Sequence, residues 1–285
     1  MRSIRSIQTA VAAVAAASVI ALAGCSGSSG DTPAKGADSS GAEAGAVTLK
    51  VGASPSPHAK ILQFVKDNLA ADAGLNLEIV EYTDYIQPNT ALNDGDLDAN
   101  YFQTVPYLEL QEKENGYEFE AGAGIHLEPL GVFSSKIKSL DELPAGGEIG
   151  IISDASNQSR ALALLAKEGL VELPADGTEA NVNNVKILKD FTFREVEGPQ
   201  LVRSLEDVDA AVINGNFAQE GGLSLAKDAI VVESPENNPA VNVLVWKTGG
   251  ENVDAVKKLD ELLRSDEVKK YIEETWTDGS VIAAF

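Results

Sequence analysis

Strand patterns alternate with amphipathic helix patterns from Val47 onward, and this alternation constrains the fold more than any other feature. VTLKVGAS, from residue 47, has the pattern of a strand, and Ser56-Pro57 after it suits a helix N-cap and first helical position. Apolar residues then recur at helical spacing, at Ile61, Leu62, Val65 and Leu69. LNLEIVEY, from residue 75, alternates as the next strand. Repeated units of this kind predict an α/β fold with a largely parallel sheet.

Two extended segments divide these units into two groups. They lie near residues 130–135 and 238–246, so the chain leaves one domain, builds a second and returns to the first. We therefore predict lobe I over residues 47–133 plus 241–285, and lobe II over residues 134–240. Two lobes joined in this way imply a cleft between them for a ligand and a hinge that closes it.

The charge balance excludes several classes of partner. The chain carries a formal net charge of −22, whereas a nucleic-acid-binding protein needs a basic surface. The same charge argues against electrostatic docking on anionic lipids. Hydrophobic residues make up 44 % of the chain, which is typical of a soluble globular protein.

The first 24 residues have the pattern of a secretory signal peptide. Arg2 and Arg5 precede an apolar, alanine-rich run that is too short for a confident transmembrane span. The run ends in Leu-Ala-Gly-Cys25, which resembles a bacterial lipobox, where cleavage before the cysteine is followed by acylation with fatty acids such as palmitate. Cys25 is the only cysteine, so no intrachain disulfide can form. We predict a lipid anchor at Cys25, a flexible tether over residues 25–46, and a protein on the extracytoplasmic face of the cell membrane.

Catalytic and metal-binding motifs are missing from the sequence. There are two histidines, His58 and His126, and no H-E-x-x-H, C-x-x-C, G-x-S-x-G or Walker pattern. Zinc and manganese receptors need several histidine or carboxylate ligands. We therefore predict no enzyme activity, no catalytic residue, no cofactor and no metal; His58 is then a capping or packing residue, and His126 a candidate pocket wall.

A small-molecule pocket is the alternative that the residues favour. Residues 82–107 contain 5 of the 16 aromatic side chains, among several amides and acids. A pocket for a ligand with an apolar end and a polar end uses both kinds of group. Alternate strand residues face opposite ways, so of the neighbours Tyr101 and Phe102 we predict that Phe102 lines the pocket.

Several segments resemble the NlpA family of lipoproteins, the MetQ-type methionine-binding proteins. They are VGASPSPHAKILQFV, EYTDYIQPNTALNDGDLDANYFQTVPYLE, HLEPLGVFSSKIKSLDELP, RSLEDVDAAVINGNFA and SDEVKKYIEETW, and the resemblance covers about residues 47–285. It implies a two-lobed periplasmic-binding-protein-like fold of type II. It also implies a monomeric protein that captures methionine, or a related amino acid or dipeptide, and delivers it to the permease and ATPase of an ABC importer.

The resemblance also assigns roles to particular residues. Aromatic walls fall on Tyr85, Phe102 and Tyr107, the carboxylate partner on Arg160, and the asparagines that hold the amino-acid backbone on Asn214 and Asn242. An arginine fork fits a carboxylate in bidentate fashion, and rings suit a polarisable thioether. Other interpretations stay open, because Arg160 also fits a solvated helix residue and Asn214 a turn residue.

Two departures from the family pattern leave the choice of ligand open. Thr104 stands where the family has a histidine in YFQHVPY, so it either alters the pocket or caps the following helix. Ala240-Val241 replace an aromatic and a small residue. A related sulfur compound therefore remains an alternative to methionine, and an adhesin- or chaperone-like surface lipoprotein remains the rival class of function.

Overall fold

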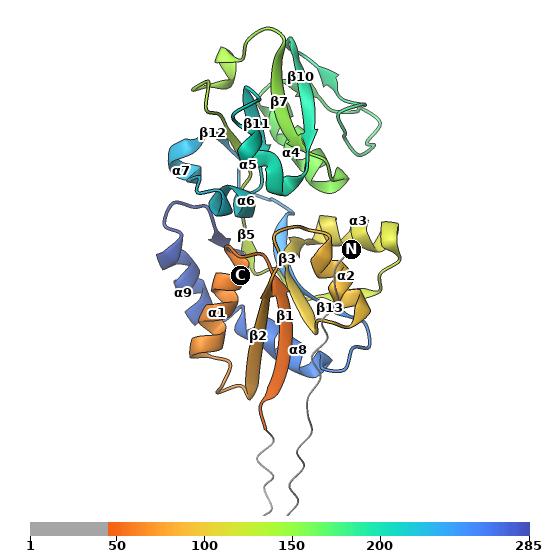
Figure 1. Cartoon of the computed structure of the whole chain (residues 1–285), viewed down its shortest axis with the longest axis vertical. Coiled ribbons are helices and arrows are strands. Elements are labelled where there is room, and N and C mark those ends of the chain that lie inside the picture. Colours follow the sequence, from red (N-terminus) through yellow and green to blue (C-terminus); the bar gives the residue numbers. More distant parts are fainter. Residues whose placement is uncertain (1–44) are drawn as a thin grey trace, which may run out of the picture. The chain divides into compact units, whose positions relative to one another are not determined.

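The computed structural model describes residues 45–285, which form two lobes joined by two chain segments (Figure 1). The predicted signal peptide, Cys25 and most of the predicted tether lie outside the described residues. Among the described helices, none is both long enough and apolar enough to span a bilayer.

The sheet of lobe I has seven strands, in the order β14-β5-β13-β3-β1-β2, with β4 also paired to β13. Its strands are β1 (Val47–Ala53), β2 (Leu75–Glu81), β3 (Ala99–Thr104), β4 (Phe119–Ala121), β5 (His126–Leu127), β13 (Val241–Lys247) and β14 (Ile282–Ala283). β1 runs parallel to β2 and β3, but β13 runs antiparallel to β3, β4 and β5. The predicted largely parallel sheet is therefore mixed, because β13 returns from the other lobe in the opposite direction.

Five helices accompany this sheet: α1 (His58–Asn68), α2 (Gln87–Asp94), α3 (Val105–Asn115), α8 (Val253–Leu262) and α9 (Asp266–Thr275). The apolar stripe predicted for α1 packs onto β1 and β2, and α9 lies alongside α1 (Figure 1). The C-terminal helices thus complete the core of the lobe that the N-terminal strands begin. Burial of this apolar surface is the main term that stabilises the lobe.

The sheet of lobe II has five strands, in the order β10-β7-β11-β6-β12. They are β6 (Gly131–Phe133), β7 (Gly147–Ile152), β10 (Phe191–Val196), β11 (Ala210–Ile213) and β12 (Ala229–Val232), and β8 (Val171–Glu172) forms a separate pair with β9 (Lys186–Ile187). The helical elements are α4 (Ala155–Lys167), α5 (Leu201–Ser204), α6 (Gly215–Glu220) and α7 (Leu225–Asp228), with 3-10 turns at Leu140–Glu142 and Gly198–Gln200.

The chain passes from lobe I to lobe II through residues 128–130 and returns to lobe I through residues 233–240. β5 belongs to the first sheet and β6 to the second, so the first crossing lies a few residues before the boundary expected after residue 133. The second crossing ends where β13 begins, at Val241. Short connections at both places bring residues from distant parts of the sequence to the space between the lobes.

The starts of α1 and α4 differ in how they are capped. Ser56 does not cap α1: its hydroxyl donates instead to Gln219 Oε1 of α6 in the other lobe, at 2.9 Å. Asp154 caps α4 by accepting from the Asn157 backbone N–H at 2.9 Å, and α4 begins at Ala155. Arg160 therefore lies in the second turn of its helix, so the N–H groups at the helix start are not its immediate neighbours.

Candidate ligand-binding site

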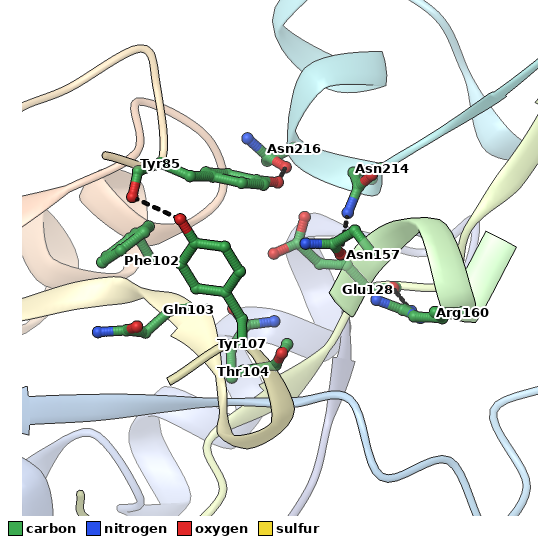
Figure 2. Close-up of a pocket in the computed structure, with 12 residues that line it drawn as sticks. Tyr85, Phe102, Gln103, Thr104, Tyr107, Glu128, Asn157, Arg160, Asn214 and Asn216 are labelled. Carbon is green, nitrogen blue, oxygen red and sulfur yellow. Dashed lines mark hydrogen bonds between the residues drawn. The ribbon is translucent and has the colours of Figure 1, made fainter. Parts of the chain in front are cut away.

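A small cavity lies where the lobes meet, lined by side chains from both (Figure 2). Its volume of about 30 Å³ corresponds to room for about two water molecules. A larger groove of about 510 Å³, between α3 and α4, shares Thr104, Asn157 and Arg160 with the cavity. These three residues therefore stand where the cavity meets the groove. The cavity lining comprises Tyr85, Phe102, Gln103, Thr104, Tyr107, Glu128, Asn157, Arg160, Asn214, Gly215, Asn216 and Asn242.

Three aromatic rings form the lobe I wall of this cavity. Tyr85, Phe102 and Tyr107 have ring centroids 5.7–6.1 Å apart, within the range of favourable aromatic contacts. Phe102 faces the cavity because it follows Tyr101 on β3, and Tyr101 points into the core behind the strand. The Tyr107 hydroxyl donates to the Tyr85 backbone carbonyl at 2.9 Å, which fixes two of the three rings relative to each other.

Glu128 provides a carboxylate at the centre of the cavity, on the first crossing between the lobes (Figure 2). Its Oε1 accepts from His126 Nε2 at 2.8 Å, whereas its buried Oε2 has no hydrogen-bond partner among residues 45–285. Burial raises the pKa of this carboxyl to about 7, although nearby His58 and Arg160 oppose the rise. A Cβ at Gly215 would lie 3.0 Å from Oε2 and 2.8 Å from Glu128 Cβ, so a glycine lets α6 approach the carboxylate.

Arg160 reaches the same space from α4 and is anchored by protein groups. Its Nε and Nη2 donate to Glu233 at 3.0 and 2.5 Å, and Nη2 also donates to the Glu128 carbonyl at 2.7 Å. The sequence analysis assigned Arg160 to a ligand carboxylate. In the structure, two of its nitrogens, Nε and Nη2, bind the carboxylate of Glu233 instead. Nη1 makes no hydrogen bond within the described part of the chain and remains as the donor that can serve a ligand.

The pairing with Arg160 lowers the pKa of Glu233. Burial alone would raise the pKa of the Glu233 carboxyl, but hydrogen bonds and charge from Arg160 hold it below its ordinary value. The pair is thus ionised, and it connects α4 with the start of the second crossing. Sequence reasoning missed Glu233, which stands 73 residues from its partner.

Asparagines complete the polar wall from both lobes. Asn214 precedes α6 and donates to Asn157 Oδ1 at 2.7 Å, and Asn216 accepts from the Tyr85 hydroxyl at 2.5 Å. Asn242, on β13, lies opposite them in lobe I. Of these four, the sequence nominated Asn214 and Asn242 but neither Asn216 nor Asn157, although Asn157 stands three residues before Arg160 in the same helix.

Thr104 and His126 take different positions relative to the cavity. Thr104 lines it and precedes α3, but its side chain makes no cap hydrogen bond within residues 45–285. His126 is fully buried behind Glu128 and is not part of the lining. The sequence analysis did not nominate Glu128. A sequence signal for it existed, because this acid follows His126 by two residues in the family-like segment HLEPLG.

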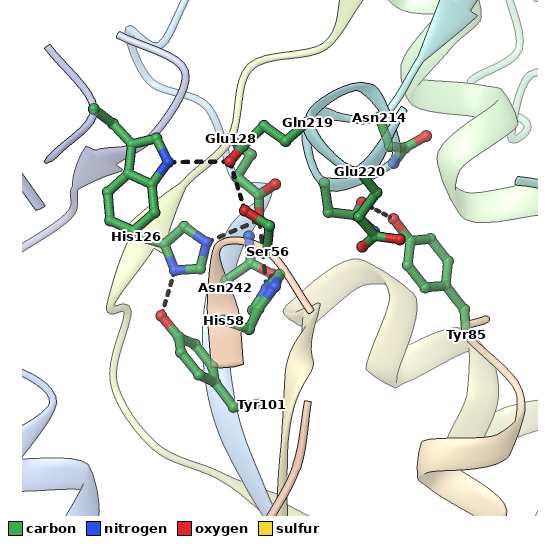
Figure 3. Close-up of polar contacts among 12 residues, drawn as sticks. Ser56, His58, Tyr85, Tyr101, His126, Glu128, Asn214, Gln219, Glu220 and Asn242 are labelled. Atoms are coloured by element: carbon green, nitrogen blue, oxygen red, sulfur yellow. Dashed lines mark hydrogen bonds and ion pairs between the residues drawn. The ribbon is translucent and has the colours of Figure 1, made fainter. Parts of the chain in front are cut away.

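His126 belongs to a buried polar cluster behind the cavity, together with His58 and Glu128 (Figure 3). Among residues 45–285, this is the single group of three potential metal ligands whose donor atoms lie within 4.8 Å of one another. Hydrogen bonds already engage both ring nitrogens of His126 and one atom each of His58 and Glu128, so we interpret the cluster as a hydrogen-bonded network. Burial lowers the pKa of His58 to about 4 and that of His126 to about 3, so both rings are neutral.

The amides that the sequence placed in the pocket serve mostly a structural purpose. Asn89, Asn100 and Gln103 form a buried, mutually hydrogen-bonded group with distances of 2.7–3.0 Å, which ties α2 to β3. A core accommodates such amides because each satisfies the others. Of the three, Gln103 alone reaches the cavity lining.

The lobes also touch each other directly around the cavity. The Tyr85 ring stacks on Phe217 of α6 with centroids 4.7 Å apart. Gln219 Oε1, on the same helix, accepts from the Ser56 hydroxyl at 2.9 Å and from Trp276 Nε1 at 3.0 Å (Figure 3). Contacts of lobe I with α6 therefore hold the two walls of the cavity together.

Two α/β lobes with a polar and aromatic cavity between them define the class of two-lobed solute-binding proteins. The family model of the NlpA lipoprotein matches residues 49–285. The chain belongs to the NlpA lipoprotein family. Membership in this family makes it a membrane-associated lipoprotein.

Relatives of known sequence and structure agree with this assignment. The methionine-binding lipoprotein MetQ of Bacillus subtilis is 37 % identical over 250 residues, which is 86 % of this chain and 90 % of MetQ. A crystal structure of a lipoprotein from Actinomyces odontolyticus is 72 % identical with a TM-score of 0.83, covering 84 % of this chain and 100 % of that one.

Two further structures carry functional descriptions. A nutrient-binding protein from Burkholderia cenocepacia, bound to methionine, is 39 % identical with a TM-score of 0.79, covering 83 % of this chain and 100 % of that one. A periplasmic substrate-binding protein of an ABC transporter from Coxiella burnetii is 35 % identical with a TM-score of 0.77, over 83 % and 100 % of the two chains. Both relatives are binding proteins, and the second belongs to an ABC transporter.

Proposed function

We propose that this chain captures a free amino acid, methionine or a close relative, between its lobes and delivers it to an ABC importer. One observation carries the proposal: the cavity joins a carboxylate oxygen that has no hydrogen-bond partner within residues 45–285, and an arginine N–H, to a wall of three aromatic rings. A zwitterion with an apolar tail needs an acceptor for its ammonium group, a donor for its carboxylate and an apolar surface for its tail.

The ammonium group of the ligand would pair with Glu128. A buried carboxylate oxygen without a hydrogen bond is unfavourable, and a cation beside it removes that cost. Binding the ammonium also favours the ionised carboxylate over the protonated form. Glu128 therefore has the chemistry to distinguish an amino acid from a simple carboxylic acid.

The carboxylate group of the ligand would accept from Arg160. Because Glu233 occupies Nε and Nη2, the guanidinium is fixed in orientation before ligand arrives, and Nη1 supplies the contact. Asn214 and Asn242, on opposite walls, would hold the remaining backbone atoms. Preorganised donors of this kind raise affinity because little side-chain entropy is lost on binding.

The side chain of the ligand would lie against Tyr85, Phe102 and Tyr107. A thioether gains about 0.3–1.5 kcal/mol from each contact with an aromatic ring edge. Entry of a whole amino acid requires more space than the cavity of about 30 Å³ provides, so the walls must separate when the ligand enters. The opening toward the groove at Thr104 and Arg160 also admits a ligand longer than methionine, such as a dipeptide.

Transport follows from closure on the ligand. Groups from both lobes contact one small molecule, so bound ligand stabilises the closed form, and an importer can recognise that form. The lipid anchor predicted at Cys25 would keep the protein at the extracytoplasmic face of the membrane, as a monomer beside a permease and its ATPase. The ligand would leave unchanged, as a binding role requires.

A panel of ligands in a thermal-unfolding assay tests this function. Specific binding to the folded state raises the melting temperature, by an amount that grows with the logarithm of the ligand concentration divided by its Kd. We expect L-methionine to raise it more than leucine or glutamate do, and Glu128→Gln to remove most of that rise. An unchanged melting temperature with every amino acid and dipeptide would refute capture and favour a surface lipoprotein without a transported ligand.

A further inference from the structure

A hydrogen-bonded relay lies behind the ligand cavity and ends on two of the residues that line it (Figure 3). The Tyr101 hydroxyl lies 2.5 Å from His126 Nδ1, and His126 Nε2 lies 2.8 Å from Glu128 Oε1. His58 Nε2 lies 3.0 Å from Asn242 Oδ1 and 3.4 Å from Glu128 Oε1. Each of these residues is at most 5 % exposed.

We propose that Tyr101, His126 and His58 are positioning residues that set which atoms of Glu128 and Asn242 face the ligand. The inference rests on the proposed function and goes beyond it, because none of the three lines the cavity. They come from β3, β5 and the start of α1, so three separate elements converge on this task.

The direction of each hydrogen bond in the relay follows from the chemistry of its members. An ionised carboxylate only accepts, so His126 Nε2 must carry the hydrogen and donate to Glu128. A neutral imidazole then accepts at Nδ1, and the Tyr101 hydroxyl must donate to it. Tyr101 therefore selects the tautomer of His126, and His126 holds Oε1 so that Oε2 remains for the ligand.

His58 sets the orientation of Asn242 through a hydrogen on Nε2, which the carboxylate oxygen Glu128 Oε1, 3.4 Å away, also favours. A donor at His58 Nε2 engages the amide oxygen of Asn242, which leaves the amide Nδ2 as a hydrogen donor for the cavity. The relay thus presents an acceptor at Glu128 and a donor at Asn242. This pairing complements the ammonium and the carboxylate of a zwitterion and disfavours ligands that lack either group.

A purely structural role for these side chains would give a different result from a positioning role. Loss of packing weakens every ligand alike, whereas loss of orientation at Glu128 weakens only ligands that carry an ammonium group. Methionine and 4-(methylthio)butanoic acid have the same thioether chain and carboxylate, and only methionine has the amine. The ratio of their affinities therefore reports on Glu128 alone.

The experiment measures both ligands by calorimetry on the full chain and on four variants. Tyr101→Phe removes only the hydroxyl, His126→Leu removes the donor to Glu128, and His126→Gln retains an N–H donor in its place. Tyr117→Phe is the matched control, since the Tyr117 ring stacks on Phe119 away from the relay. Melting temperatures recorded in parallel identify any variant that fails to fold; Tyr101→Phe, the smallest change, keeps the test possible.

We expect His126→Leu to weaken methionine binding by about tenfold or more, the range for a lost hydrogen bond to a charged group. Tyr101→Phe, which removes a hydrogen bond to the neutral imidazole of His126, should weaken it by about threefold to tenfold. Binding of the deaminated acid should stay within about threefold, and His126→Gln should recover part of the methionine affinity. Equal losses for both ligands, or no loss for methionine, would overturn the inference while leaving the proposed function standing. A wild-type chain that binds no methionine would refute the proposed function and the inference together.

Discussion

Arg160→Ala is the change that separates the two roles the structure gives this arginine. The side chain donates to both carboxylate oxygens of Glu233 and to the Glu128 carbonyl, and it lines the cavity. Truncation therefore removes the proposed partner of the ligand carboxylate and also leaves Glu233 without its cation. Binding and stability should both fall, for different physical reasons.

The two losses have different expected sizes. Removing one partner of a desolvated charge pair in a binding site costs about 2–5 kcal/mol of affinity. Removing the partner of a buried carboxylate costs about 3–5 kcal/mol of folding free energy. The Arg160 and Glu233 side chains are 15 % and 9 % exposed, so water screens the pair in part and we expect the lower end of that range.

A double variant distinguishes these contributions. Arg160→Ala with Glu233→Ala removes the stranded charge, so it should recover part of the lost stability in chemical denaturation. It should recover none of the methionine affinity measured by calorimetry. Arg194→Ala is the control, because Arg194 makes an exposed pair with Glu148 at 3.7 Å, and such pairs contribute about 0–1 kcal/mol.

Arg160→Ala with a methionine affinity within about threefold of wild type would refute the role of Arg160 as partner of the ligand carboxylate. Arg160 would then serve only to connect α4 with residues 233–240, and another group would bind the ligand carboxylate. A double variant that regains affinity would also contradict it, since the carboxylate partner is absent there.

Three further predictions concern pH, closure and ligand choice. Methionine affinity should weaken about tenfold per pH unit below about 7, because the ligand ammonium needs ionised Glu128 and burial raises the pKa of that carboxyl to about 7. Burial also raises the pKa of Glu220 to about 7, so a control must show which carboxyl is responsible. Calorimetry on Glu128→Gln provides that control, because the pH dependence should vanish in this variant. Gln219→Leu should lower affinity by about threefold to tenfold without touching the ligand, because it removes the two hydrogen bonds that Gln219 accepts from Ser56 and Trp276 of lobe I. Trp276 fluorescence should then show less closure at saturating ligand, and unchanged fluorescence and affinity would exclude a role in closure. Thr104→His should favour methionine over dipeptides, because a larger side chain narrows the opening to the groove, and an unchanged ligand panel would contradict this.

Local patterns were sufficient for most of the elements. Hydrophobic periods of two and of 3.6 residues arise within short segments, so they indicated β1, α1 and β2 without knowledge of the rest of the chain. Strand direction was less accessible, since β13 pairs with β3 only after the chain has built a whole lobe. The mixed sheet is the consequence of that long excursion.

The three rings of the cavity could be predicted, but the roles of the amides around them could not. Tyr85, Phe102 and Tyr107 lie close in sequence, and strand alternation separated Phe102 from Tyr101. Amides near those rings looked equally suited to a pocket, yet Asn89 and Asn100 satisfy each other in the core. Composition gives the kind of group present and carries no information about which partner it finds.

The sequence by itself determined that this chain forms two α/β lobes with a cleft, that its cavity has an aromatic wall, and that Arg160 is a candidate partner for an anion. Tertiary structure decided what Arg160 holds, which acid stands in the cavity, and that His126 lies behind that acid. The reason is physical: periodicity is set by neighbours along the chain, whereas charge pairs such as Arg160 with Glu233 join residues that meet only when both lobes have folded.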